Sequence, residues 1–286
     1  MPCMGAPQLP PRREDRRCAM PDKDCTFTVM TYNVHRLTGN DRHTSAARIA
    51  QVIDAYQPDI VALQELPGAR SRPEVGGACQ DLAHELALLA RRDSHYQLER
   101  ERWGNVVFSR FPMRLVRAGG LHPENRYRTM VPRGVIWVEI DICGQKLQLV
   151  NTHLGLTPRE RNYQAQVLTG AEWLAHPECR PPVLLCGDFN ALPNWSIHKR
   201  LKNALMDEQE RLKFGHTRFT FPSNLPIVRF DHIFISPDLA VEDELIPRTK
   251  LTGVASDHLP LIVKLRLACP YQSGDASNCT GSCPKS

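Results

Sequence analysis

Polar side chains that can bind metal ions or phosphate stand beside apolar, strand-like runs at several places in this 286-residue chain. The clearest is the run 183–187, which is followed by a carboxylate and a carboxamide two residues apart, Asp188 and Asn190. In α/β proteins, ligands bind at the carboxyl ends of parallel strands. We therefore expect the other such positions to converge with these two on one site: Asn33, Glu65, His153, Asp231, Asp257 and His258.

These residue types together match the needs of phosphate-ester hydrolysis. Carboxylate and carboxamide oxygens without thiolates suit a hard divalent cation, Mg²⁺ or Mn²⁺. Such a cation lowers the pKa of bound water and neutralises the charge that grows on phosphate oxygens. His153 and His258 can transfer protons or donate hydrogen bonds to phosphate. The sequence thus predicts the hydrolysis of a phosphate ester by water.

Motifs of other catalytic classes are missing from the sequence. It contains no GxSxG nucleophile elbow, no GxxxxGK[ST] phosphate loop and no GxGxxG dinucleotide motif. No apolar run approaches the roughly 20 residues that span a bilayer. The formal net charge of +5 permits a polyanionic partner without requiring one. No feature of the sequence points to an obligate protein partner.

Helices and hairpins alternate along the chain. Apolar residues at helical spacing predict helices over 44–56, 80–91 and 158–175. Residues 134–142 and 146–152 are typical of a hairpin around Gly144. Further strands are expected at 106–108, 217–221 and 259–267, and surface loops at 66–79 and 119–133. This mixture favours an α/β fold in which two mixed sheets pack face to face with helices outside.

The two ends of the chain differ in composition from its centre. Residues 1–24 are predicted to be a disordered tail, residues 25–268 the catalytic domain, and residues 269–286 a polar, Cys-containing tail. Because the first residues hold no continuous apolar stretch, we expect no secretory signal, and a cytoplasmic protein with reduced thiols. Of the ten cysteines, Cys143 and Cys186 are expected to be small core residues.

The ordered set of motifs resembles the endonuclease/exonuclease/phosphatase superfamily, which includes deoxyribonuclease-like enzymes. It covers residues 26–267 and consists of TYN (31–33), QE (64–65), GNVVFSR (104–110), NTHL (151–154), GDFN (187–190), FDHI (230–233) and SDH (256–258). Single motifs are moderately specific, whereas their order is highly specific. The resemblance implies a four-layer α/β/β/α sandwich with the site at one edge of both sheets.

The resemblance also implies roles for individual residues. Glu65 is similar to the family's principal metal ligand, with Asn33 and Asp257 near the metal. Asp188 and Asn190 resemble groups that position the attacking water and the scissile phosphate.

Four more residues complete the predicted site. By resemblance, His258 pairs with Asp231, and His153 stands where related hydrolases carry a second histidine. Asn105 resembles a residue that supports the site or touches phosphate. Arg133 lies in the predicted loop 119–133, where it either binds a substrate phosphate or is simply solvated.

The sequence therefore predicts a Mg²⁺- or Mn²⁺-dependent phosphodiesterase or nuclease that acts by in-line attack of water. Its partner is a phosphodiester substrate, either a nucleic acid or a lipid head group. Two alternatives stay open: a phosphodiesterase of phospholipid or sphingolipid head groups, and a catalytically inactive binding platform. His35 stands where abasic-site repair endonucleases carry an aspartate, which weakens the DNA-repair interpretation.

Overall fold

The computed structural model describes residues 25–67, 93–99, 103–122, 132–193, 195–203, 205–210 and 218–267. The predicted tails 1–24 and 269–286, the predicted helix 80–91 and most of the predicted loop 66–79 lie outside these residues. The proposed division of the chain into tails and one catalytic domain therefore stays a prediction.

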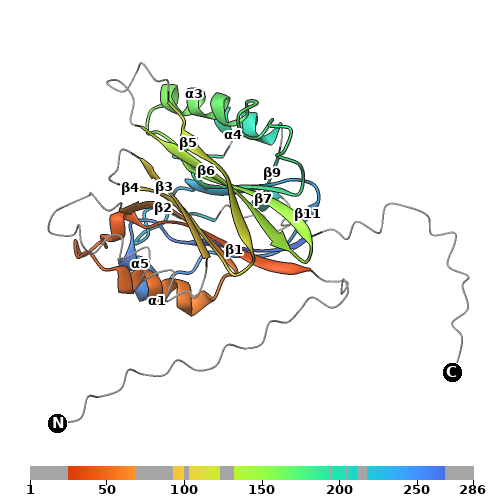
Figure 1. The fold of residues 1–286 in the computed structure, drawn as a ribbon. Coiled ribbons are helices and arrows are strands. Elements are labelled where there is room, and N and C mark those ends of the chain that lie inside the picture. Colours follow the sequence, from red (N-terminus) through yellow and green to blue (C-terminus); the bar gives the residue numbers. More distant parts are fainter. Residues whose placement is uncertain are drawn as a thin grey trace, which may run out of the picture.

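Two six-stranded sheets pack against each other (Figure 1). The first has the order β11-β12-β1-β2-β4-β3, with β1 (Thr26–Asn33), β2 (Ile60–Pro67), β3 (Asp93–Glu99), β4 (Trp103–Ser109), β11 (Leu239–Leu245) and β12 (Leu261–Leu267). The second has the order β5-β6-β7-β8-β10-β9, with β5 (Met113–Gly120), β6 (Gly134–Ile142), β7 (Gln145–His153), β8 (Val183–Asp188), β9 (Met206–Asp207) and β10 (Asp231–Ile235). Each sheet contains both parallel and antiparallel pairs, as predicted.

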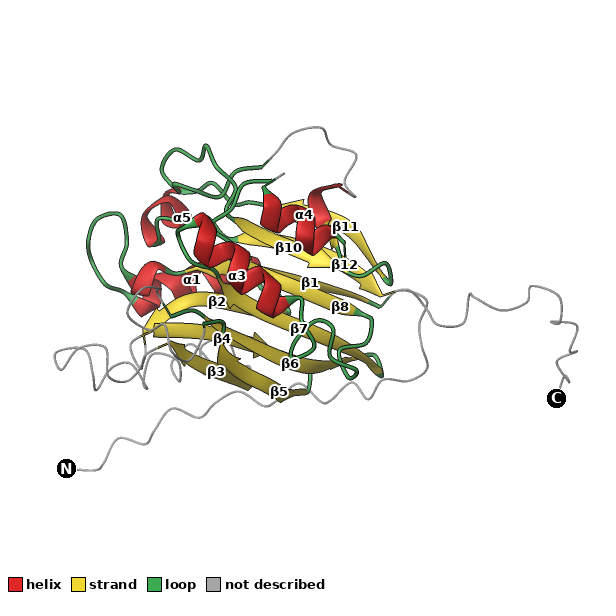
Figure 2. Ribbon diagram, turned by 90° about the horizontal axis from the view of Figure 1, so that it is seen from above, coloured by secondary structure: helices red, strands yellow, loops and turns green. Residues whose placement is uncertain are grey.

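Helices cover the outer face of each sheet (Figures 1 and 2). On the first sheet lie α1 (Ala46–Tyr56) and α5 (Lys250–Ala255), and on the second lie α3 (Pro158–Leu168) and α4 (Ser196–Lys202). The fold is therefore the α/β/β/α sandwich that the sequence predicted. No helix among the described residues is both long and apolar enough to cross a membrane.

Alternation along the strands supplies three separate cores. In β1, Phe27 and Val29 point between the sheets, whereas Met30 and Tyr32 pack toward α1. In β6, Trp137 faces α3 and α4, and its neighbours on either side face the opposite sheet. Because side chains alternate between the two faces of a strand, one apolar strand contributes to two layers of packing. This explains why central strands such as β6 and β8 are nearly continuous apolar runs.

The predicted helix 44–56 is confirmed, with Ser45 as its N-cap accepting from the backbone N–H of Arg48. The predicted helix 158–175 begins correctly but ends at Leu168. Two local features explain why the helix ends there. The Thr169 hydroxyl donates to the Ala165 carbonyl, and glycine follows at position 170. Both features weaken a helix.

Other element predictions need correction. Residues 218–220 form no strand, and Phe221 makes only an isolated bridge with Val228 before Pro222 interrupts the backbone donors. The predicted loop 119–133 is wrong at its start, because β5 extends to Gly120. The short helices α4 and α5 and the strands β3, β5, β9 and β11 were not predicted at all.

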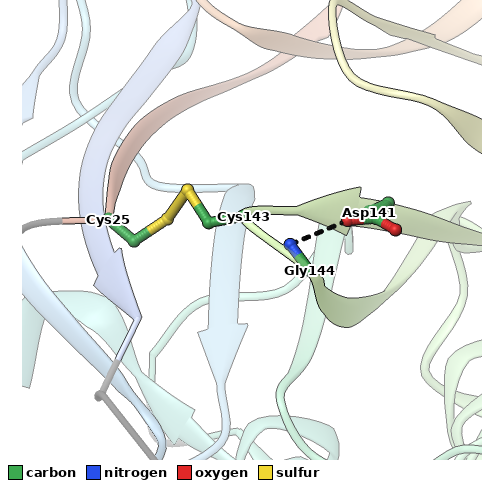
Figure 3. The surroundings of a disulfide bond; sticks show 4 residues. All are labelled: Cys25, Asp141, Cys143 and Gly144. Carbon is green, nitrogen blue, oxygen red and sulfur yellow. Dashed lines mark hydrogen bonds between the residues drawn. A yellow bond between two sulfur atoms is a disulfide. The ribbon is translucent and has the colours of Figure 1, made fainter. Parts of the chain in front are cut away.

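A disulfide joins the two sheets at the end of β1 opposite Asn33 (Figure 3). It links Cys25, just before β1, to Cys143 in the turn between β6 and β7, across 118 positions of sequence. The expectation that Cys143 is a reduced core residue is therefore wrong, since this residue is exposed and bonded. Cys186 is buried and free, as expected.

Candidate active site

The strand ends that carry the predicted residues meet at one edge of the sandwich. Strands β7 and β8 are parallel and place His153 directly beside Asp188. Strand β10 is antiparallel to β8 and places Asp231 on the other side of Asp188. Asn33, at the end of β1 in the opposite sheet, reaches across to hydrogen-bond Asp188. The two sheets therefore contribute to one buried cluster, as the sequence predicted.

Gly187 allows β7 and β8 to approach closely enough for this pairing. Its φ is +142°, and a Cβ at this position would lie 1.8 Å from the carbonyl oxygen of Thr152. Any side chain would push the two strands apart where His153 and Asp188 meet. Glycine in the GDFN motif is thus required by backbone contact as well as by backbone conformation.

Gly187→Ala is expected to destabilise the protein by about 2–3 kcal/mol and to lower any activity of the site. Urea denaturation measures the first effect. Gly144→Ala is the matched control, because Gly144 also has a positive φ (+79°) but nothing within 4 Å of its Cβ position. Equal costs for the two variants would show that the contact with Thr152 is unimportant.

Asp188 is the centre of the cluster and is fully enclosed. Its Oδ2 accepts from the Asn33 amide at 3.0 Å, and its Oδ1 accepts from the backbone N–H of Asn190 at 2.8 Å. Two imidazoles flank Oδ2, with His153 Nε2 at 3.4 Å and His258 Nε2 at 3.6 Å. Burial raises the pKa of Asp188 to about 6, although the charge of His258 opposes the rise.

His153 is held as a neutral base. The Arg133 guanidinium lies 2.9 Å from its Nδ1, and the Asn190 side-chain amide lies 3.1 Å from its Nε2. A protonated ring would carry an N–H on both nitrogens, so an N–H would face each of these two donor groups. A neutral ring keeps one lone pair that can accept from a donor. Burial first, and then the positive charges of Arg133, His258 and Arg36, bring the pKa of His153 well below its usual value.

His258 has the opposite character. Its Nδ1 lies 2.8 Å from Asp231 Oδ2. Burial alone would lower the pKa of His258, but the carboxylates of Asp231 and Asp188 outweigh it and raise this pKa to about 10. One histidine of the site is therefore neutral and the other is charged at neutral pH, a division typical of paired catalytic groups.

Asp231→Asn is expected to bring the pKa of His258 down, because it removes the largest favourable charge and a hydrogen bond. The raised pKa means that this pair stabilises the folded protein fully below about pH 6.5 and loses that effect as pH rises toward 10. NMR titration of the His258 ring in metal-free protein measures the change. Asp257→Asn, which removes a smaller contribution, is the control. A wild-type ring that titrates near pH 6.5 would contradict the assignment.

Glu65 presents an oxygen that suits a metal ion. It has a positive φ of 57° and lies where the pairing of β2 with β4 shifts register between Leu63 and Leu66. Its Oε2 is buried and has no hydrogen-bond partner among the described residues, with Arg36 Nε 3.4 Å away. A buried oxygen in this state is what a hard cation would satisfy. Glu65 therefore fits the predicted metal-ligand role.

The other two predicted metal ligands are differently engaged. The Asn33 amide donates to Asp188, and its Oδ1 accepts from the backbone N–H of His35 at 2.9 Å. Asp257 Oδ1 lies 3.7 Å from His35 Nδ1. Asp188, Asp231 and His258 also lie close enough to enclose an ion. In the structure as described, His258 Nδ1 lies 2.8 Å from Asp231 Oδ2, so these two side chains already pair with each other.

The two predicted substrate-binding residues are buried beneath the site. Asn105 is fully enclosed in β4, and its amide donates to the Gly134 carbonyl of the opposite sheet at 2.8 Å. Arg133 is only 6% exposed, so the interpretation as a solvated loop residue is wrong. A direct contact of either residue with substrate stays a prediction.

A buried polar bridge under the site escaped the sequence analysis. The Gln64 amide donates to Asn151 Oδ1 at 2.8 Å, and the Asn151 amide donates to the Leu63 and Val106 carbonyls. These contacts join the two sheets next to Glu65 and His153. Both residues belong to motifs recognised in the sequence, QE (64–65) and NTHL (151–154), which was the available signal.

A second buried cluster, with residues from α4, β9 and β10, was also missed by the sequence analysis. Asp207 is bonded by Arg229 and His198, and His232 lies 3.4 Å from it. His232 Nε2 donates to the carbonyl of Ala191, next to Asn190. Although His198, Asp207 and His232 could enclose an ion, the Arg229 guanidinium contacts both oxygens of Asp207 and already supplies the positive charge. This cluster supports the loop after β8.

Known proteins resemble this chain in sequence. A family model described as the Endonuclease/Exonuclease/phosphatase family matches residues 30–258. The Escherichia coli (strain K12) protein YbhP, itself described as uncharacterized, is 30% identical over 263 residues, which cover 87% of this chain and 100% of YbhP.

Solved structures share the fold. An endonuclease/exonuclease/phosphatase from Beutenbergia cavernae DSM 12333 has a TM-score of 0.71 at 24% identity, over 85% of this chain and 72% of that one. A Bacteroides thetaiotaomicron VPI-5482 mannosyl-6-phosphatase has a TM-score of 0.65 at 21% identity, over 84% of this chain and 99% of that one. D. rerio TDP2 in complex with a single-strand DNA product has a TM-score of 0.58 at 19% identity, over 84% and 98%.

These findings confirm the resemblance that the motifs indicated. The family model spans most of the chain, and its members are generally phosphoester hydrolases. The chain belongs to the endonuclease/exonuclease/phosphatase family.

Proposed function

We propose that this protein is a divalent-metal-dependent phosphodiesterase that cleaves its substrate by in-line attack of water, with nucleic acid as the first candidate substrate. The observation that carries the proposal is the convergence of Asp188 with a neutral His153 and a charged His258 beside the unsatisfied oxygen of Glu65. Titratable groups whose surroundings push their pKa values apart in this way are typical of catalytic acid and base pairs.

Glu65 would hold the metal, with Asp257 and Asn33 nearby. A bound Mg²⁺ or Mn²⁺ supplies Lewis-acid activation of water and neutralises phosphate charge. Asp188 orients the attacking water, because its Oδ2 is the carboxylate oxygen on which Asn33 and both imidazoles converge. Burial keeps this carboxylate basic for its type, which favours its acceptance of the water proton.

The remaining side chains bind and stabilise the phosphoryl group. Asn190 and His153 would contact its oxygens, and the Asn190 amide already lies 3.1 Å from His153 Nε2 and 3.0 Å from the Leu154 carbonyl. The charged His258, held by Asp231, stabilises the negative charge of the transition state. Arg133 holds the His153 ring in place from below.

Metal titration with bis-p-nitrophenyl phosphate tests the proposal. Wild-type protein is expected to release p-nitrophenol with Mg²⁺ or Mn²⁺ and to lose this activity with EDTA. Glu65→Gln should raise the Mg²⁺ concentration for half-maximal activity by tenfold or more. Wild-type protein that shows no turnover with either metal would favour the inactive binding platform.

A lipid head group is the second candidate substrate, and one observation favours it. The turn 222–226 is fastened to the site through Ser223, whose backbone N–H donates to the Asp257 carbonyl at 2.7 Å. In and beside this turn, Leu225 and Ile227 are 68% and 60% exposed. Supercoiled plasmid DNA and phosphatidylcholine–sphingomyelin vesicles, offered in parallel, distinguish the two classes.

A further inference from the structure

The segment that follows β1 makes a turn of unusual hand. His35, Arg36 and Leu37 have φ angles of 42°, 56° and 63°. Residues other than glycine adopt this left-handed conformation singly, and rarely in runs. Three such residues in a row without a glycine persist only where the surroundings impose the conformation, and such strain clusters at functional sites.

Contacts on both sides fix the turn against the candidate active site. The backbone N–H of Val34 donates to the Gln64 carbonyl at 3.0 Å, and that of His35 donates to Asn33 Oδ1 at 2.9 Å. The Leu37 side chain is buried in the core beneath α1. The strained residues are therefore anchored to the ends of β1 and β2, which carry Asn33 and Glu65.

The turn directs two basic side chains toward carboxylates of the site. Arg36 Nε lies 3.4 Å from Glu65 Oε2, and His35 Nδ1 lies 3.7 Å from Asp257 Oδ1. The Arg36 side chain is 54% exposed, whereas Arg133, the other guanidinium at the site, is buried beside His153. Of the two guanidiniums described at the site, Arg36 is thus the one exposed to a ligand that approaches from solvent.

We propose that Arg36 binds an oxygen of the substrate phosphoryl group and of inorganic phosphate, and that the left-handed turn serves to place its guanidinium there. This inference rests on the proposed function. The planar guanidinium matches phosphate oxygens in pairs. If Glu65 held a cation, the positive charge of that cation would compete with Arg36 for the Glu65 carboxylate, and the Arg36 guanidinium would be available to phosphate oxygens.

Arg36→Asn removes the guanidinium and suits the turn, because asparagine tolerates the left-handed conformation. Arg36→Lys keeps the charge without the fork. Arg42→Asn is the matched control, since Arg42 is exposed, has a φ of 65° and, unlike Arg36, makes no ion pair with Glu65 among the described residues. The probes are inorganic phosphate as an inhibitor of bis-p-nitrophenyl phosphate hydrolysis, and Mg²⁺ alone in calorimetry.

Arg36→Asn is expected to raise the inhibition constant of inorganic phosphate at least tenfold, Arg36→Lys by less, and Arg42→Asn not at all. Affinity for Mg²⁺ alone should stay the same or increase in Arg36→Asn. If the wild type turns over the diester and Arg36→Asn keeps its phosphate affinity, or loses Mg²⁺ affinity, the role of Arg36 is overturned while the proposed function stands. A wild type with no metal-dependent turnover instead overturns the proposed function.

Discussion

Asp188→Asn is expected to lower kcat for diester hydrolysis by about 10³-fold, the scale of a removed general base or charge-stabilising group. The substitution keeps the shape of the side chain. However, it replaces an oxygen that faces the Asn33 amide and two imidazoles with a group that cannot accept a proton. The measurement is kcat at saturating Mg²⁺, because a loss confined to KM would point to substrate binding instead.

The same substitution is expected to leave the protein as stable as the wild type, or more stable, at neutral pH. Burial raises the pKa of Asp188 to about 6, above the value of about 4 in an unfolded chain. Ionisation of Asp188 therefore opposes folding above about pH 4, increasingly up to about pH 6 and by a constant amount beyond. Loss of activity together with retained or increased stability would mark a group kept for chemistry.

Asp207→Asn is the control with the opposite expectation. Burial alone would raise the pKa of Asp207, but hydrogen bonds from His198 and His232 and the charge of Arg229 hold it well below its usual value. Its charge therefore stabilises the fold above about pH 4, and the stabilisation is lost as pH falls. Removing it breaks a buried ion pair, at a cost of about 3 kcal/mol. Asp188→Asn with activity within tenfold of wild type would contradict the assigned role.

The convergence of the site was predictable because it depends on strand ends. Asp188 and His153 each follow an apolar run, and parallel pairing of those runs brings the two residues together. The sandwich itself followed from amphipathic helices that alternate with strands and hairpins along the chain. Both inferences use periodicity and order along the chain, which the sequence displays directly.

What escaped prediction depends on contacts between distant segments. Arg133 looked like a loop residue because its burial comes from His153 on another strand. Arg229 directly precedes the FDHI motif and Asp207 stands in a polar stretch, and the two become a buried ion pair only when β9 and β10 are adjacent. The left-handed turn at Arg36 has no glycine to announce it. None of these features has a local signature.

Reduction of the Cys25–Cys143 disulfide is expected to lower the free energy of unfolding by about 4–5 kcal/mol. The bond closes a segment of 118 positions, and chain-entropy stabilisation grows with the size of the closed loop. Cys143 is exposed, so Cys143→Ser costs little packing and should reproduce the effect of reduction. Urea denaturation with and without dithiothreitol measures the loss.

The double variant Cys25→Ser/Cys143→Ser should be insensitive to dithiothreitol, which separates this bond from effects of the reductant elsewhere. Alkylation of native protein purified without reductant, followed by mass spectrometry, tests the bond itself. Modification of both Cys25 and Cys143 would contradict it. The same measurement bears on the cytoplasmic expectation, because thiols stay reduced in the cytosol and pair in oxidising compartments. If the bond is intact in protein isolated from an oxidising compartment and absent in protein isolated from the cytosol, the two products should differ in stability. Urea denaturation of both should then give a lower free energy of unfolding for the cytosolic product.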